Sequence, residues 1–167
     1  ADPGNDTRWY VNIREVEWLT ERPARQGTRV ARVAHFLGRR LAYTYVIDEL
    51  VPGERAVGRK CVTASEPWFA GHFPARPVLP GVLMTEAFAQ LACIVAMAAH
   101  TEHQGREVYL LGLDRVRFRR PVVPGDVVDI TVETLAVKRG IWKFKAVATV
   151  DGDKVAEGEL LATVADA

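Results

Sequence analysis

Three polar side chains within residues 65–100 have the types and spacing for acid–base chemistry. Glu86 and Gln90 lie four residues apart in a run that holds no Pro or Gly, so they share one face of an expected helix. A carboxyl group is costly in such apolar surroundings, and burial would favour its protonated, proton-donating form. His72 lies fourteen residues before Glu86, and a neutral imidazole can accept a proton near pH 7. We interpret His72 and Glu86 as a candidate base and acid.

The element expected to carry Glu86 is a long helix from Val82 to Ala99. Its residues are apolar nearly all round, which is typical of a helix buried on every side of a globular protein. Pro80 and Gly81 come just before it, where they are tolerated because first-turn amides have no partner within the helix. The loop that carries His72 lies immediately upstream and is rich in Pro and Gly.

The remainder of the chain after residue 40 has the pattern of β-strands separated by turn residues. Pro52-Gly53, Lys138-Arg139-Gly140 and Asp151-Gly152-Asp153 are expected turns. No β-α-β alternation is present, which favours an α+β fold with an antiparallel sheet of about six strands wrapped around one long central helix. The expected strands are Leu41–Val51, Arg55–Thr63, Val108–Phe118, Val127–Val137, Ile141–Val150 and Val155–Val164.

The first forty residues have a less regular pattern. Residues 1–8 are expected to be a cloning remnant or disordered, and residues 9–167 to form a single domain. Within it, the Arg-rich segment 9–40 would be an N-terminal extension with a strand or short helix, a break near Pro23–Gly27 and a second element over Val30–Phe36.

Composition describes a soluble globular protein. Hydrophobic residues make up 49% of the chain and the formal net charge is +1, so neither disorder nor nucleic-acid binding is indicated. The longest apolar run is too short to cross a bilayer, and no signal segment opens the sequence, so we expect a cytoplasmic protein without membrane contact. Cys61 and Cys93 lack metal-ligand spacing and are expected in the core. We expect no metal and no cofactor.

Four motifs occur in order between residues 41 and 164, and together they resemble the FabZ-type 3-hydroxyacyl-[acyl-carrier-protein] dehydratases. The resemblance implies the hotdog fold and a homodimer, possibly assembled as a trimer of dimers. It also implies an active site in which His72 and Glu86 come from different subunits. The motifs are EPWFAGHFP at 66–74, PGVL at 80–83, EAFAQ at 86–90 and GLDRVRFRRPVVPGD at 112–126.

The resemblance also assigns a reaction, the removal of water from a 3-hydroxyacyl thioester. His72 would take the α-proton and Glu86 would protonate the leaving hydroxyl group. Free amides at the helix start would stabilise the thioester oxygen, with Gly81 allowing close approach. Gln90 would orient the carboxyl group or a water. Phe73 and Tyr109 would bind substrate, Tyr109 as a gate to the acyl tunnel.

The substrate of that family is attached to acyl carrier protein through a phosphopantetheine arm. Carrier proteins are acidic, so some of Arg115, Arg117, Arg119 and Arg120 would form a docking site; otherwise they are an ordinary solvated face. Strand periodicity would project Arg115, Arg117 and Arg119 together and Arg120 to the other side.

Two alternatives stay open. One is another hotdog thioester enzyme, a thioesterase or an enoyl isomerase, although thioesterases do not need the histidine of the GHFP motif. The other is a non-catalytic hotdog subunit, which would be expected to lack His72 or Glu86. The stretch Arg39–Thr44 lacks the family's usual His-Arg-x-Pro-Phe motif. Both fatty-acid and polyketide- or polyene-type biosynthesis are therefore considered.

Overall fold

A computed structural model describes residues 13–18, 26–27, 29–36, 39–100 and 107–164. The segment 1–8, expected to be a remnant or disordered, lies outside the described residues, as does most of the predicted break near residues 23–27. The elements are β1 (Ile13–Trp18), β2 (Arg29–Phe36), β3 (Arg39–Val51), β4 (Arg55–Cys61), the 3-10 helix η2 (Pro67–Ala70), α1 (Gly81–Ala99), β5 (Val108–Phe118), β6 (Val127–Lys138), β7 (Ile141–Val150) and β8 (Asp153–Val164).

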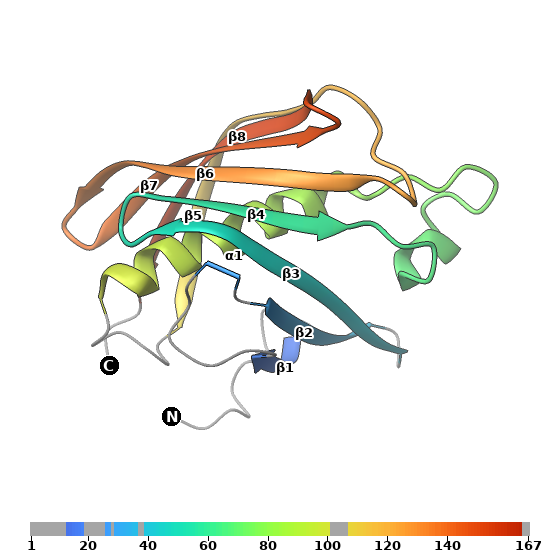
Figure 1. Ribbon diagram of the computed structural model, residues 1–167, viewed down its shortest axis with the longest axis horizontal. Helices are drawn as coiled ribbons and strands as arrows, with labels where there is room; N and C mark the ends of the chain where they lie inside the picture. Colours follow the sequence, from blue (N-terminus) through green and yellow to red (C-terminus); the bar gives the residue numbers. More distant parts are fainter. Residues whose placement is uncertain (1–12, 19–25, 28, 37–38, 101–106, 165–167) are drawn as a thin grey trace.

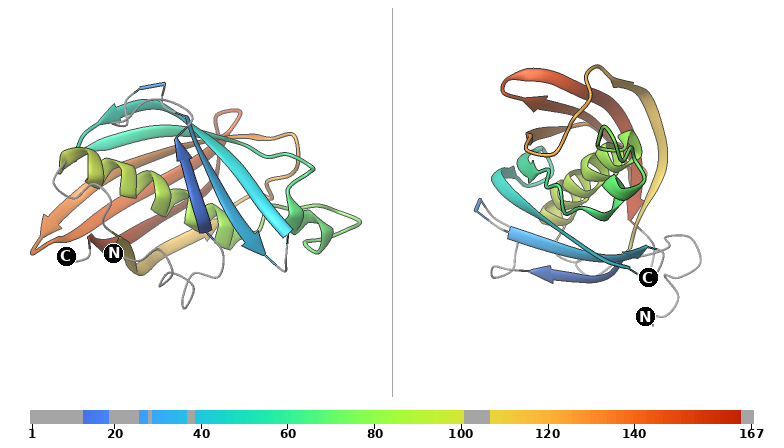
Figure 2. Two further views of the ribbon diagram at one scale, coloured as in Figure 1. Left: turned by 90° about the horizontal axis from the view of Figure 1, so that it is seen from below. Right: turned by 90° about the vertical axis from the view of Figure 1, so that its right-hand side faces the viewer.

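All strands belong to one antiparallel sheet that curls around α1 (Figure 1). Its strand order is β1-β2-β3-β4-β6-β7-β8-β5. The six expected strands are confirmed as β3 to β8, and the single long helix lies on the concave face of the sheet (Figure 2). This is the hotdog arrangement that the motifs implied. The Arg-rich segment before residue 40 adds two further strands, β1 and β2, beyond β3.

The core lies between α1 and the inner face of the sheet. Every second residue is buried along β7 and along β6 as far as Val132, which is the period expected when one face of a strand packs on a core. Gly58 in β4 faces Leu91 of α1, and a Cβ atom at Gly58 would lie 3.2 Å from a Leu91 methyl group. The absent side chain therefore lets the helix approach the sheet closely.

Two hairpins have the tight turns that their residues predicted. Arg139 and Gly140 connect β6 to β7 with φ angles of 52° and 76°. Asp151 and Gly152 connect β7 to β8 with φ angles of 52° and 84°. Two consecutive positive φ angles define the type I′ turn, whose twist matches that of the flanking strands.

Helix α1 is long and apolar enough by composition to cross a membrane, but half of that apolar window is buried inside the protein. It is therefore the core helix of the fold. Among the described residues, Cys61 is exposed and Cys93 is half-buried. The expectation of two core cysteines is therefore wrong for Cys61, which lies at the end of β4 on the face opposite buried Lys60.

Candidate active site

The segment between β4 and α1 carries His72 and is tied to both neighbouring elements. The helix η2 ends just before His72, and the carbonyl oxygen of Trp68 accepts hydrogen bonds from the amides of Gly71 (3.1 Å) and His72 (2.8 Å). Beyond His72, the amide of Val78 donates to the His72 carbonyl oxygen at 3.0 Å. The backbone of His72 is thus held from both sides.

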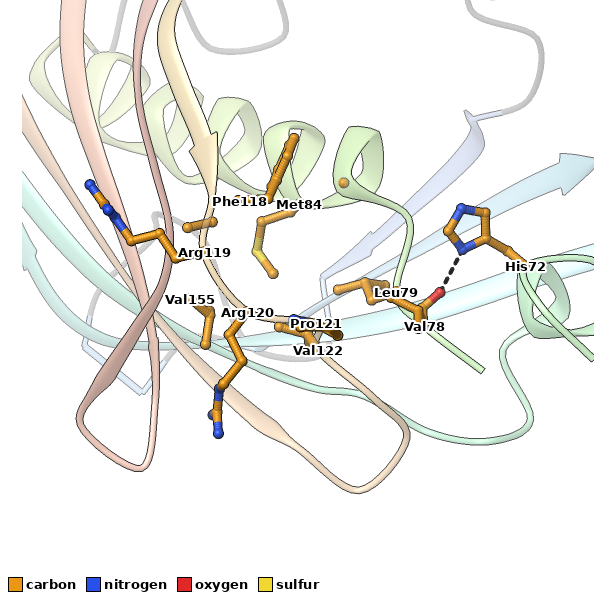
Figure 3. A pocket seen from close by; sticks show the side chains of 12 residues that line it. His72, Val78, Leu79, Met84, Phe118, Arg119, Arg120, Pro121, Val122 and Val155 are labelled. Carbon is orange, nitrogen blue, oxygen red and sulfur yellow. Dashed lines mark hydrogen bonds between the residues drawn. The ribbon is translucent and has the colours of Figure 1, made fainter. Parts of the chain in front are cut away.

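The side chain of His72 is held in one tautomer. Its Nδ1 atom lies 2.8 Å from the carbonyl oxygen of Val78 (Figure 3). A carbonyl oxygen can only accept a hydrogen bond, so Nδ1 carries the proton in this contact. The neutral ring then keeps its lone pair on Nε2, and His72 is prepared to act as a base through that atom.

Glu86 and Gln90 lie one turn apart on α1, as their spacing predicted. Gln90 is buried and Glu86 is half-buried. The side-chain amide Nε2 of Gln90 donates a hydrogen bond to Oε1 of Glu86. This contact fixes the orientation of the Glu86 carboxyl group relative to Gln90.

A pocket of about 320 Å³ opens between the His72 loop, the start of α1 and the end of β5 (Figure 3). It is lined mainly by apolar side chains. Gly81 lies in its wall, where a Cβ atom would come within 2.7 Å of the Phe118 ring. The pocket is lined by His72, Val78, Leu79, Gly81, Met84, Phe118, Arg119, Arg120, Pro121, Val122, Val155 and Ala156.

The first turn of α1 faces this pocket. The amides of Leu83 and Met84 donate to the carbonyl oxygen of Pro80, at 3.0 and 3.3 Å. The amides of Gly81 and Val82 precede these bonds and occupy the helix positions whose N–H groups have no intrahelical partner. With the positive end of the helix dipole, they suit a developing negative charge.

The two other residues predicted to bind substrate, Phe73 and Tyr109, do not line this pocket. Phe73 is exposed, and its ring centroid lies 4.5 Å from that of His72, tilted by 33°. Tyr109 lies near the start of β5, and its hydroxyl group donates a hydrogen bond to Glu107. Within this one chain, neither Glu86 nor Tyr109 lines the pocket beside His72.

The four arginines divide into two pairs. Arg119 and Arg120 line the pocket, and Figure 3 shows their guanidinium groups extending in different directions from its rim. Arg115 and Arg117 line a second hollow on the outer face of the sheet, together with Lys145. Strand periodicity does not hold through this region, because the register shifts between Asp114 and Arg117, and Arg115 has a positive φ of 54°.

Two glutamates on β8 pair with these arginines. Glu157 bonds to Lys154 and Arg119, and these contacts lower its pKa from 4.5 to about 2. Glu159 bonds to Arg115 and lies 2.7 Å from Lys143, and its pKa is also lowered, mainly by Lys143. Both carboxylates therefore remain charged at neutral pH, with several cations around them.

Sequence reasoning missed a buried ion pair beneath the His72 loop. Lys60 of β4 donates a hydrogen bond to Glu66, and both side chains are about 95% buried. A signal was available, because Lys60 interrupts an alternating row of small and apolar residues formed by Ala56, Gly58 and Val62. Burial raises the pKa of Glu66, whereas Lys60 opposes the shift.

Solved structures with the same fold include a hypothetical thioesterase and a dehydratase complex. The hypothetical thioesterase, from Streptococcus pneumoniae and with coenzyme A, aligns with a TM-score of 0.58 and 15% identity, covering 72% of this chain and 85% of that one. The dehydratase heterocomplex ApeI:P from Xenorhabdus doucetiae aligns with a TM-score of 0.54 and 22% identity, covering 69% and 92%. At these identities the likeness shows the fold alone.

Sequence comparison is more specific. The FabA-like domain family matches residues 41–159. The 3-hydroxyacyl-[acyl-carrier-protein] dehydratase FabZ of Myxococcus xanthus is 44% identical over 140 residues, covering 82% of this chain and 92% of that protein. The FabZ of Roseiflexus castenholzii is 51% identical over 115 residues, covering 69% and 80%. The chain therefore belongs to the FabA-like family, as a relative of its FabZ dehydratases.

Proposed function

We propose that this protein is a hydro-lyase that removes water from a 3-hydroxyacyl thioester to give the trans-2-enoyl thioester. The observation that carries the proposal is the imidazole of His72, whose Nδ1–H is bonded to Val78 and whose ring lies at an apolar pocket. An imidazole with its lone pair on Nε2 suits proton abstraction beside a carbonyl group. The FabZ names of relatives at 44–51% identity support the same reaction.

The proposed reaction assigns one step to each group. Nε2 of His72 takes the proton from C2, while the amides at the start of α1 stabilise the negative charge that develops on the thioester oxygen. The C3–O bond then breaks, the C2–C3 double bond forms, and the hydroxyl group leaves as water with the proton from Glu86. Gln90 holds the Glu86 carboxyl group through its hydrogen bond during this transfer.

The substrate is proposed to arrive on acyl carrier protein, as the names of the FabZ relatives state for those proteins. The thioester is proposed to belong to fatty-acid or polyketide-type biosynthesis. The thioesterase alternative rests on fold likeness at 15% identity and gains no support from the His72 geometry. A cytoplasmic location is consistent with an apolar helix that is packed inside the sheet.

A homodimer is part of the proposal, because the concave face near β5 is incompletely covered. Leu113 and Phe118 pair with the buried residues Leu160 and Ala156, yet they are 42% and 54% exposed. Val82 on α1 is 73% exposed, and β5 ends the sheet. A second copy would cover these apolar side chains. In the proposed dimer, Glu86 of the second copy would complete the His72 pocket, which Glu86 of the same chain does not line.

His72→Ala and Glu86→Gln test the catalytic assignment. We expect each to lower kcat/KM for hydration of a crotonyl thioester by ~10²–10⁴-fold, because general acid and base catalysis have that magnitude. Loss of the enoyl absorbance measures the rate, and circular dichroism checks the fold. Retention of more than about a tenth of wild-type kcat/KM in either variant would show that its residue is not the base or acid.

Arg117→Glu tests carrier docking, because Arg117 does not line the pocket beside His72. We expect kcat/KM to fall by about tenfold or more with a carrier-bound substrate at low salt, and the loss to shrink as salt screens the charges. A short N-acetylcysteamine thioester should be turned over as in the wild type. Lys138→Glu is the matched control, because it makes the same single charge reversal at the opposite end of the sheet. Equal losses on both substrates would contradict docking.

A further inference from the structure

The ion pair between Lys60 and Glu66 lies beneath the loop that carries His72. Lys60 faces the interior of the sheet, in the same row as buried Ala56 and Val62. Only 4% of its side chain and 5% of the Glu66 side chain are exposed. A lysine at such a position must be paired to remain charged, and Lys60 donates a hydrogen bond to Oε1 of Glu66.

Lys60 also holds a second residue of the loop. Its Nζ atom lies 5.6 Å from the centre of the Trp68 ring, within the range of a cation–π contact. Glu66 and Trp68 both belong to η2, since Glu66 is its N-cap and Trp68 its second residue. One ammonium group of the sheet thus contacts the short helix at two points.

A continuous set of contacts connects this ammonium group to the candidate base. The carbonyl oxygen of Glu66 accepts the amide of Phe69 at 3.2 Å, which closes the η2 turn. The carbonyl oxygen of Trp68 accepts the amide of His72 at 2.8 Å. Because His72 has this bond on one side and Val78 on the other, movement of η2 would displace the imidazole.

The contribution of the Lys60–Glu66 ion pair to the stability of the fold does not by itself explain its presence. The second carboxylate oxygen of Glu66, Oε2, is buried and has no hydrogen-bond partner within the described part of the chain. Burial also raises the pKa of this carboxyl group, which means that the charged form is disfavoured there. Buried ion pairs can often be replaced by apolar residues without loss of stability, and the geometry they impose is then their contribution.

We infer that Lys60, through Glu66 and Trp68, is a positioning residue that sets the place of His72 in the active site. The inference rests on the proposed function of His72 as the base. Lys60 touches no reacting atom. Lys60 instead fixes the position of η2, and the His72 amide is hydrogen-bonded to the Trp68 carbonyl oxygen of that helix.

The decisive variant separates stability from geometry. Lys60→Met with Glu66→Leu replaces the pair by apolar side chains of similar size. We expect it to melt at or above the temperature of the Lys60→Met single variant, because no charge is left unpaired. Its kcat for a short thioester should nevertheless fall at least tenfold, with KM within about twofold, because small misplacement of a catalytic group can cost ~10²-fold. Recovery of wild-type kcat together with thermal stability would overturn the inference.

A direct readout of His72 does not depend on activity. Histidine-labelled protein gives ring resonances, and the His72 signal is assigned by its loss in His72→Ala. We expect the His72 Nδ1 and Nε2 shifts to change in the double variant and also in Glu66→Gln, which keeps size and serves if the double variant does not fold. Unchanged shifts in every folded variant would overturn the inference.

Arg59→Met is the matched control, because Arg59 precedes Lys60 on β4 and forms an exposed ion pair with Asp129 at 3.0 Å. It should leave both kcat and the His72 resonances unchanged.

The experiments distinguish failure of this inference from failure of the proposed function. If His72→Ala kept its activity, the assignment of the base would be wrong, whereas the resonances would still report whether Lys60 positions the ring.

Discussion

At the first residue of α1, an added side chain would crowd the wall of the pocket. Three atoms of the Phe118 ring lie 2.7–3.0 Å from the place where a Cβ atom of Gly81 would be. Phe118 is part of the pocket wall and its ring is partly exposed. The ring can therefore move away from an added methyl group, but only by changing the shape of the pocket.

Gly81→Ala should lower activity more than stability. Alanine favours a helix by up to ~1 kcal/mol over glycine, which offsets the crowding against a partly exposed ring. We expect the melting temperature to stay close to that of the wild type and kcat/KM for a short thioester to fall about tenfold or more. Adding Phe118→Leu should restore part of the loss by making room. Wild-type turnover in Gly81→Ala would show that the ring and the pocket tolerate the methyl group.

Strands β5 and β8 are connected by ion pairs on the outer face of the sheet. Glu157 of β8 bonds to Arg119, just beyond β5, and to Lys154 on its own strand. Its pKa is lowered to about 2, first by Lys154 and then by Arg119. A lowered pKa in the folded state means that this carboxylate stabilises the fold when it is charged.

The pH dependence of this contribution has a definite sign. Stability from Glu157 is fully present above its unfolded pKa near 4.5 and is lost as the pH falls towards about 2. We therefore expect Glu157→Gln to make the melting temperature less sensitive to pH between 5 and 2, as measured by thermal scans at a series of pH values. Asp151→Asn in the β7–β8 turn serves as a control. An unchanged pH dependence in Glu157→Gln would show that solvent screens both contacts.

At the scale of the whole molecule, the two proposed catalytic residues of one chain do not line the same pocket. His72 lies at a pocket that Glu86 of the same chain does not line, although both side chains are held by hydrogen bonds. The exposed apolar residues of β5 and α1 lie where a second copy would complete the core. In the proposed homodimer, catalysis would depend on assembly, because the partner subunit would contribute the acid.

Mixing two inactive variants tests this division. If His72→Ala and Glu86→Gln are mixed under conditions of subunit exchange, a mixed dimer contains one site with both native residues. We expect activity to return to at most half the wild-type value per mixed dimer, with exchange confirmed by mass spectrometry of differently labelled subunits. Exchange without recovered activity would place both residues in a site within one chain.

Much of this protein could be predicted from local patterns. The type I′ turns follow from the residues at Arg139-Gly140 and Asp151-Gly152, because few residues adopt a positive φ without strain. Strands β5 and β7 have the predicted bounds, and α1 begins within one residue of its prediction. The positions of His72 and Glu86 came from motifs, which depend on chemistry at a fixed spacing.

Other features depended on contacts between distant segments. The register of β5 against β8 shifts between Asp114 and Arg117, and Arg119 and Arg120 both line the pocket. The period of a strand does not indicate such a shift. The Arg-rich segment became β1 and β2 because the edge of β3 was available for pairing. The sequence pattern predicts Lys60 only as part of a strand, because its partner Glu66 reaches it only when the loop folds back over the sheet. Local sequence determines backbone preference and side-chain period, whereas pairing energies arise only after the chain has brought its segments together.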